Sequence, residues 1–229
     1  MAELLFREDP YLTACEATVV SVHENAVELD RTVFYPLGGG QAGDTGKVGN
    51  WRVLDTRKGA GGDSVLHLLE PGARLEPGVT VPIEIDWQRR HRLMRLHTAL
   101  HLLGAVVKAP VTGGRIGDDK AHLDFDIEME KLVKEEIEAR LNELTGKGHP
   151  TVPRWITDAE LDARPELVKT MSVAPPRGEG RVRLLEIPGV DLQACGGTHV
   201  KNTAEIGRLA VARIRSEGKR NKRVTLTFA

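Results

Sequence analysis

The sequence is poor in cysteine, which limits how the fold can be held together. Its 229 residues include two cysteines, Cys15 and Cys195. Two cysteines provide no disulfide framework and fit a reducing compartment. Cys195 lies between glycines and a histidine and is a candidate ligand, so we interpret Cys15 as a small buried hydrophobe.

The sequence also lacks a long apolar run and an excess of charge of either sign. No stretch approaches the length of a membrane span, and the opening residues MAELLFRED lack the apolar segment of a signal peptide. We therefore expect a cytoplasmic protein. The net charge of -1 excludes a uniformly polycationic nucleic-acid binder, so a nucleic-acid surface has to be a local basic patch.

The run from Arg90 to Val107 carries the segment HTALH, with His97 and His101 one helical turn apart. The spacing of its leucines predicts a helix with one face turned to a core and both histidines at the edge of that face. Such an edge is where a half-buried metal ion would lie. Far downstream, the segment CGGTH offers Cys195 and His199. Taken alone, either pair is more often ordinary polar packing than a ligand pair.

Together the two segments predict a tetrahedral site of one thiolate and three imidazoles, His97, His101, Cys195 and His199. This ligand set favours one zinc ion per chain over magnesium or calcium. A zincin protease places a glutamate directly after its first histidine, whereas Thr98 follows His97 here. A metalloprotease is therefore disfavoured.

The first part of the chain has short segments rich in Val, Ile and Leu, separated by Gly, Asn and Pro. The expected strands are 17–22, 26–30, 51–55, 65–69 and 79–86. They suggest a small antiparallel barrel or sandwich. We predict an α+β protein with a β-barrel-like domain at 1–88 and a mixed α/β, zinc-containing domain at 89–229.

A glycine cluster, Gly38, Gly39, Gly40 and Gln41 followed by Gly43, lies between two of these strands. Its GxGxxG spacing fails as a dinucleotide fingerprint because no amphipathic helix follows, and a Walker loop is not matched. Two interpretations stay open. The cluster is a tight turn that needs positive φ angles, or a loop that touches a substrate.

The second part of the chain mixes helices and strands. We expect strands at 121–126 and 181–187, with His122 facing outward, and a turn at 110–115. The apolar spacing from Met129 to Leu144 predicts a helix that is stopped by Gly146 and Gly148. Thr157 with Glu160 predicts a capping box, and 207–215 with 223–228 predicts a closing hairpin.

The closing hairpin is basic. Arg215, Lys219, Arg220, Lys222 and Arg223 are candidates for contact with nucleic-acid phosphates. A solvated edge that prevents strand pairing is the alternative. A second basic cluster, Arg89, Arg90, Arg92 and Arg95, lies at the start of the histidine helix.

The segments RLHTALHLL, CGGTH and FYPLGGGQ with DTG occur in this order over nearly the whole chain. In this they resemble the editing domain of alanyl-tRNA synthetases and the free-standing editing proteins of the AlaX type. The resemblance implies hydrolysis of the ester in mischarged tRNA(Ala), chiefly seryl and secondly glycyl. It also implies that the glycine cluster lies near the substrate. No obligate protein partner or synthetase adenylation motif is evident.

Alternatives to this function are a zinc-stabilised RNA-binding module without activity, and editing of Ser-tRNA(Thr). We take His97, His101, Cys195 and Thr112 as the candidate catalytic residues. Serine differs from alanine by a hydroxyl, so its recognition needs a polar partner. Thr112, in the expected turn after the helix, is preferred over Thr98, which points away from the leucines, and over Thr198.

Overall fold

The computed structural model describes residues 2–61, 64–170 and 180–229. The chain forms two compact units, Met1–Arg92 and Leu93–Ala229, and the division falls within helix α1 (Trp87–Val107). The α+β class predicted from the sequence is confirmed. The border at 88/89, as a border between two functional domains, stays a prediction. Within the described part of the chain, no helix is both long and apolar enough to cross a membrane.

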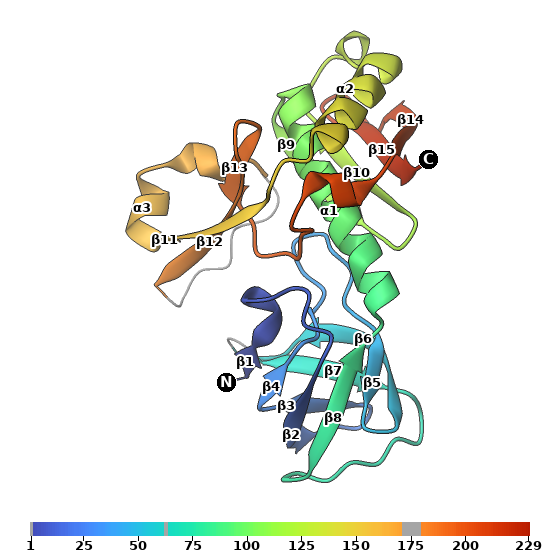
Figure 1. Cartoon of the computed structure of the whole chain (residues 1–229), viewed down its shortest axis with the longest axis vertical. Helices are drawn as coiled ribbons and strands as arrows, with labels where there is room; N and C mark the ends of the chain where they lie inside the picture. Colours follow the sequence, from blue (N-terminus) through green and yellow to red (C-terminus); the bar gives the residue numbers. More distant parts are fainter. Residues whose placement is uncertain (1, 62–63, 171–179) are drawn as a thin grey trace. The chain divides into compact units, whose positions relative to one another are not determined.

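The first unit contains a closed antiparallel barrel, coloured blue to teal in Figure 1, with strand order β2-β3-β7-β6-β5-β8. Its strands are β2 (Ala14–Val22), β3 (Ala26–Leu29), β5 (Gly46–Val48), β6 (Trp51–Lys58), β7 (Val65–Leu69) and β8 (Thr80–Ile85). In β8, Val81, Ile83 and Ile85 are buried and alternate with exposed residues, as a strand with one core face requires. A barrel therefore replaces the sandwich alternative. A short parallel pair, β1 (Glu3–Leu4) with β4 (Arg31–Thr32), accompanies it.

The glycine cluster forms a tight turn in the first unit. Gly38 and Gln41 exchange backbone hydrogen bonds of 3.1 and 2.9 Å, and between them Gly39 and Gly40 have φ angles of 56° and 81°. Two successive positive φ angles favour glycine because side chains clash there. Gly43 is needed for another reason, since a Cβ atom would lie 2.1 Å from the Thr56 carbonyl oxygen. The turn interpretation is confirmed, and contact with a substrate stays a prediction.

One histidine is enclosed in the first unit. His67 is fully buried, with Nδ1 3.1 Å from the Val27 carbonyl oxygen and Nε2 2.8 Å from the Thr32 hydroxyl. A carbonyl only accepts, so Nδ1 carries the proton and Nε2 accepts from Thr32. Burial lowers the pKa of His67 to about 4. The ring is therefore neutral in the folded protein at neutral pH.

This histidine should make the first unit less stable in acid. The unfolded chain binds a proton near pH 6.5, where the folded chain does not, so stability is retained above pH 6.5 and lost as pH falls towards 4. The total loss is about 3 kcal/mol. Chemical denaturation between pH 4 and 7 should show this slope in the wild type and a reduced slope in His67→Gln. The exposed His23→Gln should keep the wild-type slope, and equal slopes in all three proteins would contradict the assignment.

The second unit is built on helix α1, which is buried on all sides in its middle. Every residue from Leu96 to Leu103 is buried, and His97 and His101 are 6% and 4% exposed. The expectation of one core-facing stripe with a half-buried site at its edge is therefore wrong. Spacing alone could not show that sheet and loop segments cover the remaining faces of the helix.

Two sheets accompany α1. The first has the order β14-β15-β10-β9, and the second β11-β12-β13. Their strands are β9 (Val111–Ile116), β10 (Lys120–Phe125), β11 (Val152–Thr157), β12 (Arg181–Ile187), β13 (Asp191–Ala194), β14 (Leu209–Ser216) and β15 (Lys222–Phe228). The expected closing hairpin is thus β14–β15. The expected turn at 110–115 is wrong, because residues 111–116 form strand β9 and pair with β10.

Two further helices complete the unit. Helix α2 (Lys134–Lys147) ends at Gly148, which caps it with a φ angle of 68°, so Gly146 is not its stop and Met129 lies before it in a 3-10 turn. Helix α3 (Asp158–Asp162) begins with the predicted capping box of Thr157 and Glu160. It packs on one face of the second sheet, where Leu161, Leu167, Val182 and Leu184 form a small core.

Candidate metal centre

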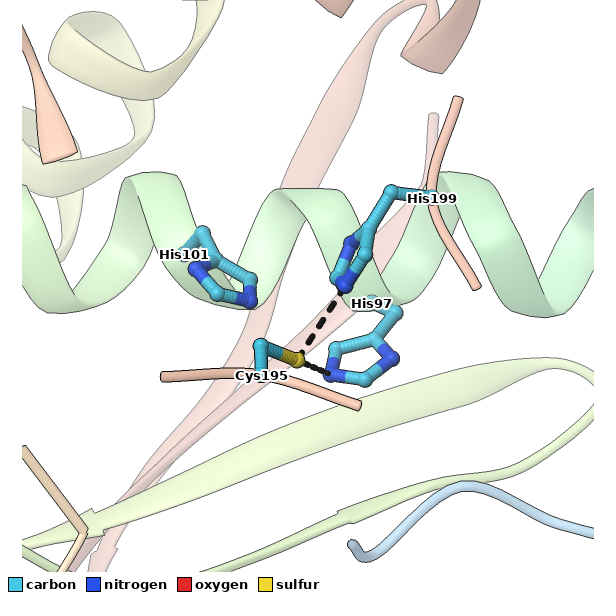
Figure 2. A group of neighbouring side chains, drawn as sticks. All are labelled: His97, His101, Cys195 and His199. Atoms are coloured by element: carbon cyan, nitrogen blue, oxygen red, sulfur yellow. Dashed lines mark hydrogen bonds between the residues drawn. The ribbon is translucent and has the colours of Figure 1, made fainter. Parts of the chain in front are cut away.

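Three histidines and one cysteine meet in the second unit. His97 and His101 project from α1, and Cys195 and His199 come from the segment after β13, so that all four side chains converge (Figure 2). One potential ligand atom from each lies within 4.8 Å of the others. The structure therefore brings together the four residues chosen from the sequence. Their role as metal ligands stays a prediction.

The distances and chemistry suit a small, soft cation. The Cys195 Sγ atom is 3.5 Å from His97 Nε2 and 3.2 Å from His199 Nε2. In a tetrahedral zinc site with bonds of 2.0–2.3 Å, ligand atoms lie roughly 3.3–3.7 Å apart. One thiolate with three imidazoles is also a ligand set that zinc prefers over magnesium or calcium. These two pairs are already spaced for a metal ion, whereas ligand atoms up to 4.8 Å apart would have to move closer to bind one.

The outer nitrogen of His101 is fixed by a buried carboxylate. His101 Nδ1 lies 2.8 Å from Asp191 Oδ2, and Asp191 is 6% exposed. Asp191 also accepts from the amide of Gln193 at 2.8 Å and pairs with Lys169. A carboxylate only accepts, so Nδ1 donates the proton and the other ring nitrogen is turned to the cluster.

His199 is oriented from α1 itself. The Thr98 hydroxyl lies 3.3 Å from His199 Nδ1 and donates to the Met94 carbonyl at 2.9 Å. Thr98 is fully buried, and the backbone amide of Val200 donates to the same hydroxyl at 3.3 Å. Thr98, expected to point away from the leucines, therefore contacts a member of the cluster. Its hydroxyl already has structural partners, which makes it a poor sensor for a substrate.

The turn that carries Cys195 is held by Arg183 of β12. The Arg183 guanidinium donates to the carbonyl oxygens of Cys195 at 3.1 Å and Gly197 at 2.9 Å. The Cys195 amide in turn donates to the Arg183 carbonyl at 3.0 Å, which extends the β12–β13 pairing by one residue. The sheet thus sets the position of the thiol relative to α1.

The electrostatics favour a thiolate. Burial would raise the pKa of Cys195, but the neighbouring His97 and His199 hold it well below its usual range. Burial opposes a charge on His101, yet its hydrogen bond to Asp191 raises the His101 pKa to about 9. Burial and the nearby His97 lower the pKa of His199. The imidazoles therefore favour the charged form of Cys195, which is the form of a thiol that binds a metal ion.

Other residues singled out from the sequence lie outside this cluster. Gln41 is fully buried in the first unit, so the exposed part of its turn is glycine backbone. His122 lies on β10 and does not belong to the four-residue group. Thr112 lies on β9, and its buried hydroxyl has no hydrogen-bond partner within the described residues.

The five basic residues of the closing hairpin differ in how exposed their side chains are. Lys222 is 9% exposed and donates to the Gly218 and Lys219 carbonyls, and Arg223 pairs with Asp124 at 2.8 Å. Arg215 pairs with Glu217, and Arg220 pairs with Asp126 while its side chain stays 71% exposed. Arg215, Lys219 and Arg220 are exposed.

Two arginines of the second basic cluster, Arg90 and Arg95, are held by internal partners. Arg90 is fully buried and binds Asp44. Arg95 donates to the Ile206 carbonyl at 2.7 Å and lies over the Phe228 ring. These arginines serve packing, which charge counting along the sequence could not distinguish.

Sequence reasoning missed Asp191, Gln193, Lys169 and Arg183. Arg183, Asp191 and Gln193 are brought to the cluster by the pairing of β12 with β13. Lys169 reaches it through its contact with Asp191. An acidic residue a few positions before Cys195 was the available signal, because ligating histidines usually donate to a carboxylate or carbonyl.

Part of the second unit matches a known family of protein domains. Residues 182–225 match the family described as the threonyl and alanyl tRNA synthetase second additional domain. This match covers Cys195 and His199 but not the histidines of α1.

Full-length relatives extend the comparison to the whole chain. The alanyl-tRNA editing protein AlaX-M of Saccharolobus solfataricus is 37% identical, over 99% of this chain and 99% of its own length. AlaX-M of Methanosarcina barkeri is 35% identical, over 100% and 99%. The alanine–tRNA ligase of Methanothermobacter thermautotrophicus is 37% identical over 92% of this chain and 24% of its own length. The chain belongs to the alanyl-tRNA editing protein family, as its motifs predicted.

Proposed function

We propose that this protein is a zinc-containing deacylase that hydrolyses mischarged tRNA(Ala), with Ser-tRNA(Ala) as the main substrate and Gly-tRNA(Ala) as the second. The observation that carries the proposal is the buried group of three histidines and one cysteine. It lies in a chain that aligns end to end with alanyl-tRNA editing proteins.

In the proposed reaction, water adds to the ester carbonyl and the acyl–oxygen bond breaks. The ribose oxygen at the tRNA 3′ end takes up a proton, and the free amino acid leaves. His97, His101, Cys195 and His199 would hold the zinc ion. With all four ligands bound the ion would be structural, and with one ligand displaced it would supply Lewis acidity for the ester hydrolysis.

The remaining residues give this site its rigidity. Asp191 fixes the proton of His101 on Nδ1, Thr98 contacts the outer nitrogen of His199, and Arg183 holds the Cys195 turn. Fixed ligands keep the pocket shape and the polar groups around the ester in place, so little reorganisation is needed during reaction.

The deciding experiment is a deacylation assay with the metal-loaded protein. Ser-tRNA(Ala), Gly-tRNA(Ala), Ala-tRNA(Ala) and Ser-tRNA(Thr) are compared, with wild type against His101→Ala. His122→Ala is the matched control because this histidine lies on β10 outside the cluster. We expect fast hydrolysis of Ser-tRNA(Ala), lost in His101→Ala and kept in His122→Ala. Binding of tRNA without hydrolysis would favour a zinc-stabilised RNA-binding module without activity. Faster hydrolysis of Ser-tRNA(Thr) than of Ser-tRNA(Ala) would favour editing of Ser-tRNA(Thr).

Thr112 is the proposed partner for the serine hydroxyl. Its buried hydroxyl has no partner within residues 2–61, 64–170 and 180–229, and such an orphan costs about 1–3 kcal/mol of stability unless a ligand satisfies it. Thr112→Val should therefore lower serine removal by about ten- to a hundredfold without lowering the unfolding temperature.

Thr225→Val, on β15 of the same sheet, is the matched control for the Thr112 assay. Single-turnover rates on Ser-tRNA(Ala) and Ala-tRNA(Ala) measure the effect. An unchanged ratio of these two rates in Thr112→Val rules this threonine out as the sensor.

The exposed part of the basic hairpin, Arg215, Lys219 and Arg220, is the proposed contact with the tRNA backbone, because Lys222 is buried and Arg223 is half-buried against Asp124. Removing one phosphate contact lowers the salt slope of binding by about 0.7–0.9. We expect this change for Lys219→Gln, measured as log Kd against log salt concentration. Arg140→Gln, an exposed cation on α2, should keep the slope. If both variants behave as wild type, the backbone contact lies elsewhere.

A further inference from the structure

The sheet β11-β12-β13 has two different faces. One packs on α3 through Ile156, Val182, Leu184 and Leu192. Alternation along each strand places Trp155, Arg181 and Arg183 on the other face. On this second face Trp155 is 44% exposed, and the Arg181 guanidinium lies 5.4 Å from the centre of its ring. A large, exposed aromatic ring beside a cation is unusual for a surface without a ligand.

The strand register connects this tryptophan to the metal centre. Trp155 of β11 is directly opposite Arg183 of β12, and Arg183 accepts a backbone hydrogen bond from Cys195. The three residues therefore form one row across three adjacent chain segments. At about 4.8 Å per segment, the Trp155 backbone lies roughly 10 Å from that of Cys195.

We infer that Trp155 and Arg181 form a stacking platform for an unpaired nucleotide of the tRNA 3′ end. This inference rests on the proposed function, which requires the terminal ribose ester to reach the cluster. The nucleotides before it are single-stranded, and roughly 10 Å corresponds to about three nucleotides of a stacked strand at 3.4 Å each. One of them then lies over Trp155, where the ring stacks on the base and Arg181 attracts the backbone.

The surroundings of Trp155 fit a nucleotide better than a protein partner. Its same-face neighbours along β11 are the exposed Pro153 and Thr157, and Arg181 lies over it. A protein interface is built around a contiguous apolar patch of several hundred Å², whereas single aromatic rings with adjacent cations are typical of single-stranded RNA binding.

The test measures binding, so it does not depend on turnover. The probe is tRNA(Ala) carrying serine through a non-hydrolysable amide at its 3′ end, compared with the same tRNA lacking its unpaired 3′ nucleotides. We expect Trp155→Leu to weaken binding of the intact probe by about 5- to 100-fold. Trp155→Phe, which keeps an aromatic ring, should stay close to wild type. All variants should bind the truncated tRNA as the wild type does.

Arg181→Gln provides a second variant, with Arg154→Gln as its charge-matched control. Arg154 lies on the opposite face of β11 and pairs with Glu186, so only Arg181→Gln should weaken binding of the intact probe. Unchanged binding in both Trp155→Leu and Arg181→Gln overturns the platform, as does an equal loss on the truncated tRNA. If the wild type binds the probe but does not deacylate Ser-tRNA(Ala), the proposed function fails while the platform stands. If it binds no tRNA, both fail.

Discussion

The double variant Cys195→Ala/His199→Ala is expected to lose its zinc and, with it, the ordered packing of the second unit. These two residues connect the segment after β13 to helix α1 through the cluster. Structural zinc binding contributes roughly 10–16 kcal/mol at neutral pH, which equals or exceeds the typical net stability of about 5–15 kcal/mol. Without it, the buried His97 also loses its contact with the Cys195 thiol.

Elemental analysis of protein purified without chelator measures this directly, together with thermal unfolding. The wild type should hold one zinc per chain and the double variant none, with a much lower unfolding temperature. Cys15→Ala/His122→Ala removes the same residue types outside the cluster and should keep its zinc. Full metal in the Cys195/His199 variant would refute the ligand assignment, and a wild type without stoichiometric metal would refute the site.

Local patterns were enough to find the four clustered residues. His97 and His101 share a helix face through their spacing, and Cys195 and His199 share a short turn. What surrounds them was not predictable, because Asp191 meets His101 only through the pairing of β12 with β13. The same limit explains Thr98, for which a helical wheel implied an outward direction although the helix is covered on that side too.

The barrel was predicted with less detail for a similar reason. Five of its strands carry alternating or continuous apolar residues, but β5 has three residues with a lysine in the middle, and its pairing with β6 and β8 closes the barrel. Closure depends on partners distant in sequence. Charge patterns were the least informative, since Arg90 looked like a candidate phosphate ligand and is fully buried.

Removing the charge of Asp44 is expected to destabilise the first unit by about 3–5 kcal/mol. Asp44 is 1% exposed and accepts from Arg90 Nε at 2.9 Å and from the Tyr35 amide at 2.6 Å. Arg90 also donates to the carbonyls of Pro10 at 2.9 Å and Val33 at 2.7 Å. In Asp44→Asn the arginine stays buried by these two bonds while its counter-charge is gone.

The size of this effect separates a buried ion pair from an exposed one. Glu3 and Arg31 lie 3.5 Å apart with side chains 56% and 48% exposed, so Glu3→Gln should cost less than about 1 kcal/mol. Denaturant unfolding followed by tryptophan fluorescence gives both values. The double variant Asp44→Asn/Arg90→Met should recover part of the loss, because the uncompensated charge is removed with its partner. A cost for Asp44→Asn as small as that for Glu3→Gln would show that Arg90 reaches water. In that case Asp44 of the DTG segment would not serve to anchor Arg90 and the start of α1.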